Sequence, residues 1–381
     1  MRKKIARTRP GLKICVVTGI PPLNLLVYKF IQVLEPTVDE LVLITGNYPE
    51  KDVFSPKIKL INIVPDTKKQ SLLFRIPKFI FLQLKFTWNL VKNLSQTKIV
   101  FFFLEGGLFL FPMLSAKIAR KKTIIVATHS STLIAKQLYK SKNMPRIISI
   151  VENLNYKLVD KIIIFYPSML EHFKLEKYTD KIIVAHRHFI NFDVFKIKYP
   201  LDKRPNIIGF VGRLSKEKGI LNFLASIKLL SEKEKSLSFF IVGDGELRDE
   251  VQNYIDKENL GQRVRIIGWV QHEELPKYFN KMKLMVLPSY TEGLANVIVE
   301  AMACGTPVLA TAVGAIPDVI KDGQNGFILE NNSPETIANC IKKVLNRDNL
   351  DQIATNALSM VKKEYVLEAT VERYKDIMIN Y

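Results

Sequence analysis

Short runs rich in isoleucine, valine and phenylalanine recur along the whole chain, and longer segments with helical periodicity separate them. In the first half the runs are Lys13–Thr18, Leu41–Thr45, Ile58–Val64, Ile99–Phe103, Thr123–Thr128, Lys161–Phe165 and Lys181–Ala185. In the second half they are Ile207–Val211, Leu237–Val242, Val264–Ile267, Leu284–Leu287, Val308–Thr311 and Gly326–Ile328. Nearly continuous apolar strands that alternate with helices predict parallel sheets covered by helices on both faces. We therefore expect an α/β protein.

The length of 381 residues is more than one small core needs and predicts two domains. Each half alternates strands and helices, so we expect two doubly wound, Rossmann-like domains that face each other across a cleft. The polar segment 192–205, with Pro200 and Pro205, is expected to link them. The predicted domains are 1–198 and 204–362, and the terminal helix 365–381 is expected to pack back on the first domain.

Positive charge is concentrated in the first half of the chain. Residues 1–200 contain 33 Lys and Arg against 13 Asp and Glu, whereas residues 201–381 contain 23 against 24. This asymmetry predicts that the first half meets an anionic partner, for which a membrane surface, a nucleic acid and a polyanionic substrate are candidates.

Residues 67–104 contain no acidic residue, and cations from Lys68 to Lys98 alternate there with aromatic and aliphatic residues such as Phe81 and Trp88. Interfacial helices have this composition, so the segment predicts peripheral association with an anionic membrane surface. The alternative is a helix that packs its apolar side on the sheet and turns its lysines to water.

The remaining composition excludes several classes of protein. Cys15, Cys304 and Cys340 are scattered without metal-binding spacing, which predicts a reducing compartment and no structural zinc. The apolar stretch Ile99–Leu114 is interrupted at Glu105 and is shorter than the ~20 residues of a spanning helix. We expect neither a transmembrane segment nor a secretory signal.

Glycine-rich turns follow the predicted strands of the second half. After strand 207–211, Gly212 allows a tight turn, and Arg213 and Lys218 follow before a helix that begins near Gly219. Two cations beside a glycine turn and a helix N-terminus suit a diphosphate, although a loop with surface charges is the alternative. The spacing matches neither a P-loop nor a GxGxxG motif.

Two similar turns are expected at the same edge of the sheet. One runs from Gly243 to Gly245, and the other runs from Gly268 to Val270, with a backbone placed to face a nucleobase. Ordinary connecting turns are the alternative for both.

Two glutamates flank the start of a predicted helix in residues 291–305. Glu292 precedes the first turn and Glu300 lies in the second, so their Cα atoms should be roughly 10–12 Å apart at ~1.5 Å per residue. This exceeds the ~5–9.5 Å of a hydrolase carboxylate pair and suits the two ends of one elongated ligand. A solvent-facing glutamate and a capping glutamate are the alternative.

Together these motifs closely resemble the donor domain of family 4 glycosyltransferases, which have the GT-B fold. Their order and spacing carry the resemblance, which covers residues 205–345, whereas residues 1–200 resemble the family only loosely. The motif residues are Gly212 to Leu214 with Lys218 and Gly219, Val242 to Gly245, Pro288 and Ser289 with Glu292 and Gly293, Glu300 to Ala303, Gly305 to Val308, and Asn325 with Gly326.

The resemblance implies a retaining, metal-independent glycosyltransferase that needs no cofactor. Its donor would be a UDP- or GDP-linked sugar bound by the second domain, and its acceptor a glycan or lipid-linked glycan bound by the first. The transferred group is expected to be a hexosyl or N-acetylhexosaminyl group. We expect the protein to act in the cytoplasm, at the inner face of the cell membrane, and to have no nucleic-acid partner.

The resemblance also assigns roles to residues of this sequence. Arg213 and Lys218 match the residues that hold the donor diphosphate, Glu292 the carboxylate that contacts the transferred sugar, and Glu300 the carboxylate that binds the ribose. The remaining donor-site candidates are Gly19, Gly212, Gly243, Val270, Leu294, Ala295 and Asn296.

Histidines are expected to differ in importance. His129 ends a predicted strand in a Thr-x-His-like segment and is the fourth catalytic candidate, with a packed histidine as the alternative. His186 and His188 lie where the family usually has Asn-Gly-Val-Asp, so the resemblance gives them no role. His172 and His272 are expected at the surface. The first loop also departs from the family, because Gly19 stands without the usual second glycine.

Two other functions remain as alternatives. A related GT-B enzyme, such as a nucleotide-sugar epimerase or a phosphorylase, is one. An epimerase is expected to lack the Arg213 and Lys218 pair beside the two glutamates. The other is a basic nucleic-acid-binding protein, although the sequence contains no recognised module of that kind.

Overall fold

A computed structural model describes residues 11–19, 24–46, 54–63, 72–138, 143–231 and 234–380 of the protein. The chain forms two compact units: residues 1–187 together with 370–381, and residues 188–369. Among the sequence-based predictions, Lys68, Lys69 and the loop after Gly19 lie outside the described residues.

The first unit is built on a seven-stranded parallel sheet with the order β3-β2-β1-β4-β5-β6-β7. Most of the residues in β1, β2 and β4 are buried, because helices cover both faces of the sheet. The strands are β1 (Lys13–Thr18), β2 (Glu40–Thr45), β3 (Ile58–Asn62), β4 (Ile99–Phe103), β5 (Lys122–Val126), β6 (Lys161–Ile164) and β7 (Ile182–Val184).

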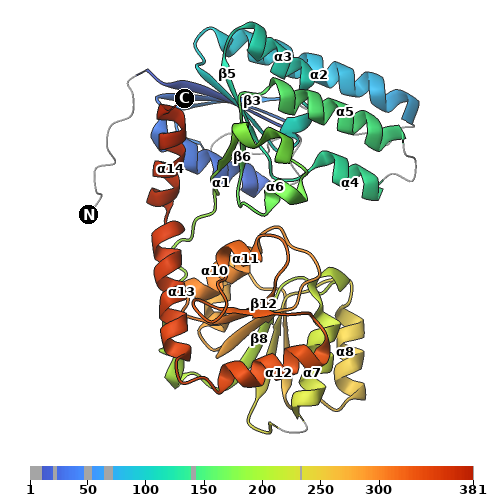
Figure 1. The fold of residues 1–381 in the computed structure, drawn as a ribbon, viewed down its shortest axis with the longest axis vertical. Helices are drawn as coiled ribbons and strands as arrows, with labels where there is room; N and C mark the ends of the chain where they lie inside the picture. The colour runs from blue at the N-terminus through green and yellow to red at the C-terminus, as the bar shows by residue number, and fades with distance from the viewer. Residues whose placement is uncertain are drawn as a thin grey trace. The chain divides into compact units, whose positions relative to one another are not determined.

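Helices form a layer on each face of this sheet (Figure 1). One layer contains α1 (Asn24–Leu34) and the terminal helix α14 (Leu367–Ile379), whose Tyr374 ring lies 5.6 Å from that of Phe30. The predicted packing of the C-terminal helix on the first domain is therefore confirmed. The other layer contains α2 (Leu72–Leu94), α3 (Leu110–Ile118), α4 (Ser131–Leu138) and α5 (Asn143–Leu158), and the short α6 (Met169–His172) follows β6.

The second unit has a six-stranded parallel sheet with the order β10-β9-β8-β11-β12-β13. Its strands are β8 (Ile207–Val211), β9 (Ser238–Val242), β10 (Val264–Gly268), β11 (Leu284–Leu287), β12 (Val308–Thr311) and β13 (Phe327–Leu329). Its helices are α7 (Ile220–Ser231), α8 (Arg248–Lys257), α9 (Leu275–Phe279), α10 (Asn296–Ala303), α11 (Ile316–Val319), α12 (Pro334–Leu345) and α13 (Leu350–Glu364).

In both sheets the strand order reverses beside the first strand. β1 lies between β2 and β4, and β8 lies between β9 and β11. On one side of each first strand the sheet continues with the next strands of the chain, and on the other side it continues with the later strands. Ligands of doubly wound sheets bind outside the carboxyl ends of the strands at such a switch point. The prediction of two Rossmann-like parallel sheets is confirmed, and the switch points identify where a site belongs in each unit.

The described residues contain no helix that combines the length and the apolar character needed to cross a bilayer. The longest helix among the described residues, α2, has 23 residues and carries several lysines and an arginine. Ile99–Leu114 forms the buried strand β4, a glycine-containing turn and the beginning of α3, as the sequence predicts.

Two buried side chains, Arg204 and Asn280, hold the segment predicted as a linker against the rest of the second unit, and Asn280 Oδ1 accepts a hydrogen bond of 2.6 Å from the amide of Lys198. Arg204 is 4% exposed, and its Nη1 donates to the carbonyls of Phe279 and Met282 and to Oγ1 of Thr306, at 2.9–3.2 Å. Its Nη2 donates to the carbonyl of Cys304 at 2.7 Å. Burial lowers the pKa of Arg204 to about 10, so the side chain is still charged at neutral pH.

Replacing Arg204 with methionine is expected to lower the free energy of unfolding of the second unit by about 3 kcal/mol, because several buried carbonyls lose their donor. Urea unfolding followed by circular dichroism measures this loss. Arg263→Met is the matched control, since Arg263 donates to a single carbonyl, that of Glu234. Equal losses in the two variants would contradict the anchoring role of Arg204.

Candidate active site

Two loops meet at the switch point of the second unit, one after β8 and the other after β11. The backbone amide of Tyr290 donates to the carbonyl of Glu217 at 2.8 Å. Gly219 has a φ of +67°, and a Cβ at this position would lie 2.1 Å from the carbonyl oxygen of Pro288. Glycine is therefore required here, both for the left-handed conformation and for the close approach of the two loops.

The two loops bring Lys218 and Glu292 together. Lys218 Nζ lies 2.7 Å from Glu292 Oε1, and the same oxygen accepts a hydrogen bond of 2.8 Å from Ser289 Oγ. The side chains of Lys218 and Glu292 are only 19% and 6% exposed, so water screens the pair weakly. A cation and a carboxylate are thereby held at the carboxyl edge of the sheet, where a phosphorylated ligand is expected.

Arg213 is placed differently from Lys218. Its side chain is 67% exposed, and Nη2 lies 3.5 Å from Oε1 of Glu217. An exposed arginine in a weak surface ion pair is free to turn towards an anion at low cost. Arg213 and Lys218 were both predicted to bind the donor diphosphate. The structure places Lys218 against the largely covered side chain of Glu292 and leaves Arg213 at the surface.

Glycines bring the turns after β8, β9 and β10 into contact. The amide of Gly212 donates to Val242 at 3.0 Å, and that of Gly243 donates to Gly268 at 2.8 Å. Gly243 has a φ of +136°, and a Cβ there would lie 1.9 Å from the carbonyl oxygen of Gly212. The candidate residues Gly212 and Gly243 therefore belong to one continuous backbone edge, and Val270 follows it after the exposed Trp269.

Helix α10 places the second glutamate at this edge. Glu300 lies in the second turn of the helix, is 6% exposed on its side chain, and its Oε1 lies 2.8 Å from Nε2 of His272. His272 is 47% exposed and belongs to the turn before α9. The expectation of a plain surface histidine therefore missed its contact with Glu300, because 28 residues separate the two in the sequence.

The candidates Leu294, Ala295 and Asn296 form the entry to α10. Asn296 is the first residue of the helix, and Ala295 provides no side-chain cap to the first turn. Backbone N–H groups at the start of a helix lack partners within the helix. The carbonyl oxygens of Glu292 and Gly293 lie against Gly314, where a Cβ would be 1.9 Å from the carbonyl of Glu292. The loop before α10 is thus fixed by close backbone packing.

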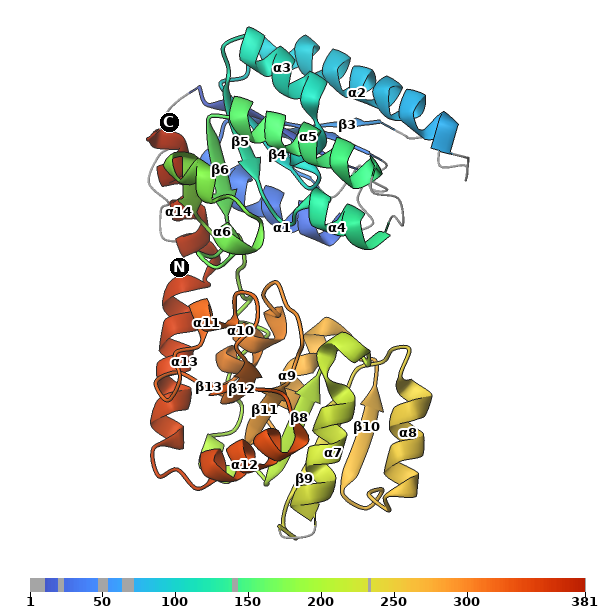
Figure 2. The same ribbon diagram turned by 45° about the vertical axis from the view of Figure 1, so that its right-hand side comes forward.

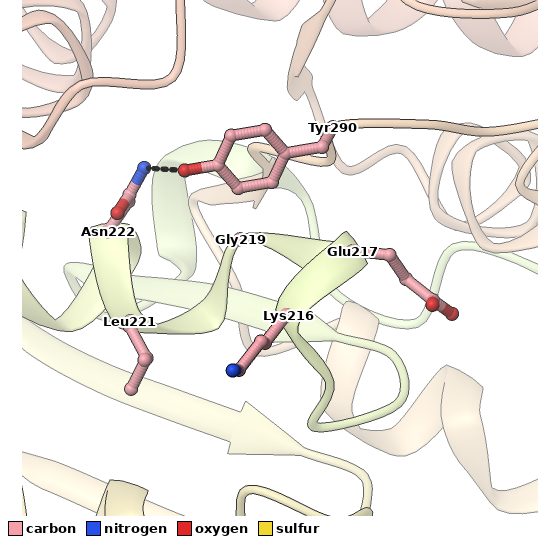
Figure 3. Close-up of a pocket in the computed structure, with 6 residues that line it drawn as sticks. All are labelled: Lys216, Glu217, Gly219, Leu221, Asn222 and Tyr290. Carbon is pink, nitrogen blue, oxygen red and sulfur yellow. Dashed lines mark hydrogen bonds between the residues drawn. The ribbon is translucent and has the colours of Figure 1, made fainter.

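A pocket of about 450 Å³ lies beside the loop that carries Lys218 (Figure 3). Its lining residues are Lys216, Glu217, Gly219, Leu221, Asn222 and Tyr290. Asn222 Nδ2 donates to the hydroxyl of Tyr290 at 2.8 Å and to the carbonyl of Asn332 at 2.6 Å. No local sequence pattern predicts this pocket, because its walls come from two loops and a helix.

In the first unit the switch point is formed by Gly19 and Glu105. The amide of Gly19 donates to the carbonyl of Leu104 at 3.3 Å, and a Cβ at Gly19 would lie 2.7 Å from Glu105 Oε2. Glu105 itself has a left-handed φ of +53°, which is uncommon for a residue other than glycine. Gly19 is therefore at a carboxyl edge, as predicted for a site residue, and a glutamate faces it there.

His129 lies in the loop between β5 and α4. Its Nδ1 is 2.9 Å from Oγ1 of Thr128. Burial lowers the pKa of His129 below its usual 6.5, and the nearby charge of Glu152 opposes this shift. A neutral imidazole at pH 7 is the form that can both donate and accept a hydrogen bond.

Glu152 of α5 organises the loop that carries His129. It is 5% exposed and accepts hydrogen bonds from the amide of Ser131 at 2.8 Å and from Oγ1 of Thr132 at 2.5 Å. Its side chain also lies against Gly107, where a Cβ would be 3.1 Å from Glu152 Cγ. The sequence reasoning missed Glu152, although a lone glutamate in an otherwise cationic stretch is a visible signal.

The contribution of His129 to the stability of the first unit is expected to fall as the pH is lowered below 6.5, because the unfolded chain protonates His129 before the folded chain does. This contribution is complete above the unfolded pKa and is lost as the pH falls through the folded pKa. Urea midpoints measured between pH 7.5 and pH 5 would show the slope. His129→Gln should flatten it, whereas His172→Gln serves as the control and should leave it unchanged.

No group of three His, Cys, Asp or Glu side chains within the described ranges is arranged to hold a metal ion. The metal-independent reaction stays a prediction.

Solved structures match the whole architecture. HepE of Anabaena in complex with UDP superposes with a TM-score of 0.73 over 97% of this chain and 100% of its own, at 16% sequence identity. Sucrose-phosphate synthase of Thermosynechococcus elongatus gives a TM-score of 0.69 over 97% and 98%, at 18% identity. With its two Rossmann-like sheets, the chain has the GT-B fold, which confirms the predicted fold class.

Most of the second unit also matches a known protein family. Residues 191–359 match Glycosyl transferases group 1, so this part of the chain is a glycosyl transferases group 1 domain. The resemblance to a glycosyltransferase donor domain is thereby confirmed for these residues, and the assignment to family 4 stays a prediction.

Curated relatives agree with this family. The alpha-D-kanosaminyltransferase of Streptomyces kanamyceticus is 31% identical over 47% of this chain and 47% of its own length. A galactosyltransferase of Escherichia coli that acts on alpha-D-GlcNAc-diphosphoundecaprenol is 27% identical over 47% of each chain. An N-acetyl-D-galactosaminyltransferase of Campylobacter jejuni, which acts on a PP-undecaprenol-linked glycan, is 24% identical over 68% of this chain and 69% of its own. The match to the first of these relatives spans about half of that protein's length.

Proposed function

We propose that the protein is a retaining glycosyltransferase that moves a hexosyl or N-acetylhexosaminyl group from a UDP- or GDP-linked sugar to a glycan or lipid-linked acceptor. The observation that carries the proposal is the Lys218–Glu292 pair, partly buried at the switch point of a group 1 domain. The pair supplies a cation for the leaving diphosphate and a carboxylate for the sugar within 2.7 Å of each other.

The proposed division of work follows the positions of the side chains. Lys218 neutralises negative charge that develops on the diphosphate as the glycosidic bond breaks, and the exposed Arg213 turns onto the same phosphates when the donor binds. Glu300, held by His272, accepts hydrogen bonds from the ribose hydroxyls. The backbone from Leu294 to Asn296 adds the N-terminal dipole of α10. These positive groups perform the charge stabilisation, so the proposed reaction proceeds without a metal.

The acceptor is proposed to bind the first unit near Gly19 and His129. A lipid-linked acceptor agrees with two relatives that act on undecaprenol diphosphate glycans and with the cationic first half of the chain. The proposed place of action is the cytoplasmic face of the cell membrane, with the protein bound peripherally.

A thermal-shift screen against UDP, GDP, ADP and their sugars tests the donor half of the proposal. One of the three nucleotides, together with its sugar derivatives, is expected to raise the melting temperature of the protein. The corresponding nucleotide sugar should then be consumed when an acceptor is added. Addition of EDTA is expected to change neither result. No shift with any nucleotide would contradict the proposal, and a shift lost in EDTA would contradict its metal independence.

A further inference from the structure

Three neighbouring helices of the first unit expose apolar side chains on their outer sides. Figures 1 and 2 show α2, α3 and α5 side by side, and α3 contacts both of the others. We call this surface the three-helix face. Its exposed apolar residues are Phe81, Leu84, Trp88 and Val91 on α2, Leu114 and Ile118 on α3, and Ile147, Ile150 and Leu154 on α5.

The apolar residues of α2 form two stripes with different environments. Phe86 and Leu90 are fully buried against the rest of the unit, as a helix that covers a sheet requires. On the opposite side, Phe81, Leu84 and Trp88 recur at spacings of three and four residues and are 52–63% exposed. The core of the unit therefore accounts for the inner stripe only, and α2 is apolar on its outer side as well.

The other two helices continue this outer stripe. Ile118 at the end of α3 is 82% exposed, and Ile150 in α5 is 61% exposed, with Ile147 and Leu154 one turn before and after it. Single exposed apolar residues need no explanation, but an exposed apolar surface that spans three adjacent helices marks an interaction site.

Cations predominate around the face, although Lys117 of α3 pairs with Asp160 at 2.6 Å. Residues 67–151 contain 15 Lys and Arg and a single acidic residue, Glu105. The next acidic residue, Glu152, is 5% exposed and already accepts hydrogen bonds within the unit. On the face itself, Lys85 Nζ lies 4.8 Å from the centre of the Phe81 ring and Lys92 Nζ lies 4.7 Å from that of Trp88.

We propose that the three-helix face docks on an anionic lipid bilayer, with Phe81, Trp88, Ile118 and Ile150 entering the interface. Aromatic and aliphatic side chains beside lysines, in a stretch where cations far outnumber carboxylates, match the chemistry of such a surface. A protein partner of ordinary composition would present charges of both signs, whereas a bilayer with anionic headgroups presents one. The inference deepens the lipid-linked acceptor proposed above by naming the surface that holds the enzyme at its substrate.

Co-sedimentation of the full chain with vesicles tests the docking face. Vesicles of phosphatidylcholine with 30% phosphatidylglycerol are expected to bind the protein more tightly than vesicles of pure phosphatidylcholine. The reason is that each cation near an anionic surface contributes ~1 kcal/mol of attraction. Replacing both Phe81 and Trp88 with serine should weaken binding by about a hundredfold, roughly tenfold for each side chain. Lys85→Gln with Lys92→Gln should remove most of the preference for phosphatidylglycerol.

Tyr199→Ser is the matched control, because Tyr199 is an aromatic residue of the second unit that is 55% exposed. It should bind vesicles as the parent does. Melting temperatures and donor-induced thermal shifts of all variants separate docking from folding and from donor binding. Equal vesicle binding by the parent and the Phe81→Ser, Trp88→Ser variant would overturn the docking face. A dimer in sedimentation velocity that the same variant dissociates would overturn it too, in favour of a second copy as the occupant.

Discussion

Replacing Lys218 with alanine is expected to lower kcat by about 10²–10³-fold, the usual effect of removing one preorganised group that stabilises charge in a transition state. Lys218 is 19% exposed and sits 2.7 Å from a carboxylate that is 6% exposed, so its ammonium is held in a weakly screened position before any ligand arrives. Steady-state kinetics with the donor identified by the thermal-shift screen measures the loss. The donor-induced shift should disappear in the same variant.

Two companion variants make this result specific. Lys257→Ala changes an exposed lysine at the end of α8 and should leave kcat near that of the parent. Lys218→Ala also leaves Glu292 without its cation, so a stability loss of about 1–3 kcal/mol is expected beside the catalytic loss. Lys218→Ala combined with Glu292→Gln should recover stability without recovering kcat. A kcat close to that of the parent in Lys218→Ala would refute the diphosphate assignment.

Replacing Gly243 with alanine is expected to abolish nucleotide binding and to destabilise the second unit by several kcal/mol. Two independent effects act at this residue. Its φ of +136° is a conformation that residues with a Cβ rarely adopt, and the new methyl group would lie 1.9 Å from the carbonyl oxygen of Gly212. The turns after β8 and β9 must then separate, which displaces the loop that begins at Gly212.

Gly261→Ala is the control for Gly243→Ala. No atom lies within 4 Å of a Cβ added at Gly261, which belongs to a surface turn of the same unit. Its melting temperature and its nucleotide-induced shift should match those of the parent. If nucleotide raises the melting temperature of Gly243→Ala as much as that of the parent, the close approach of the two turns is not needed for donor binding.

The strands could be read from the sequence because each is buried on both faces of its sheet. Three runs in the second half, among them 207–211 and 284–287, coincide with β8, β11 and β12, and the runs for β9 and β10 differ from the observed strands by one residue at one end. Elsewhere the ends moved by one or two residues, as in β7, because the last pairing of an edge strand depends on its neighbour. The polar segment 192–205 lies inside the second unit, and its attachment there through Arg204 involves partners up to 102 residues away.

The candidate site was likewise predictable from the sequence only in part. The glycine turns and the identities of Lys218, Glu292 and Glu300 were visible as local motifs. The pairing of Lys218 with Glu292 joins residues 74 positions apart, and that of His272 with Glu300 joins residues 28 apart. No local pattern encodes these pairs, since they follow from the order in which the strands lie in the sheet.

The sequence by itself determined two parallel α/β units, the cationic first half and the residue types available for a diphosphate and a sugar. These properties depend on short-range patterns: apolar runs, glycine spacing and charge count. Only the tertiary structure decided which side chains meet. It placed β8 next to β11, which buries Lys218 against Glu292, and it laid α2, α3 and α5 side by side, which makes one surface of three separate stripes. The physical reason is that contacts between distant segments are set by sheet topology and by helix packing, which no stretch of neighbouring residues specifies.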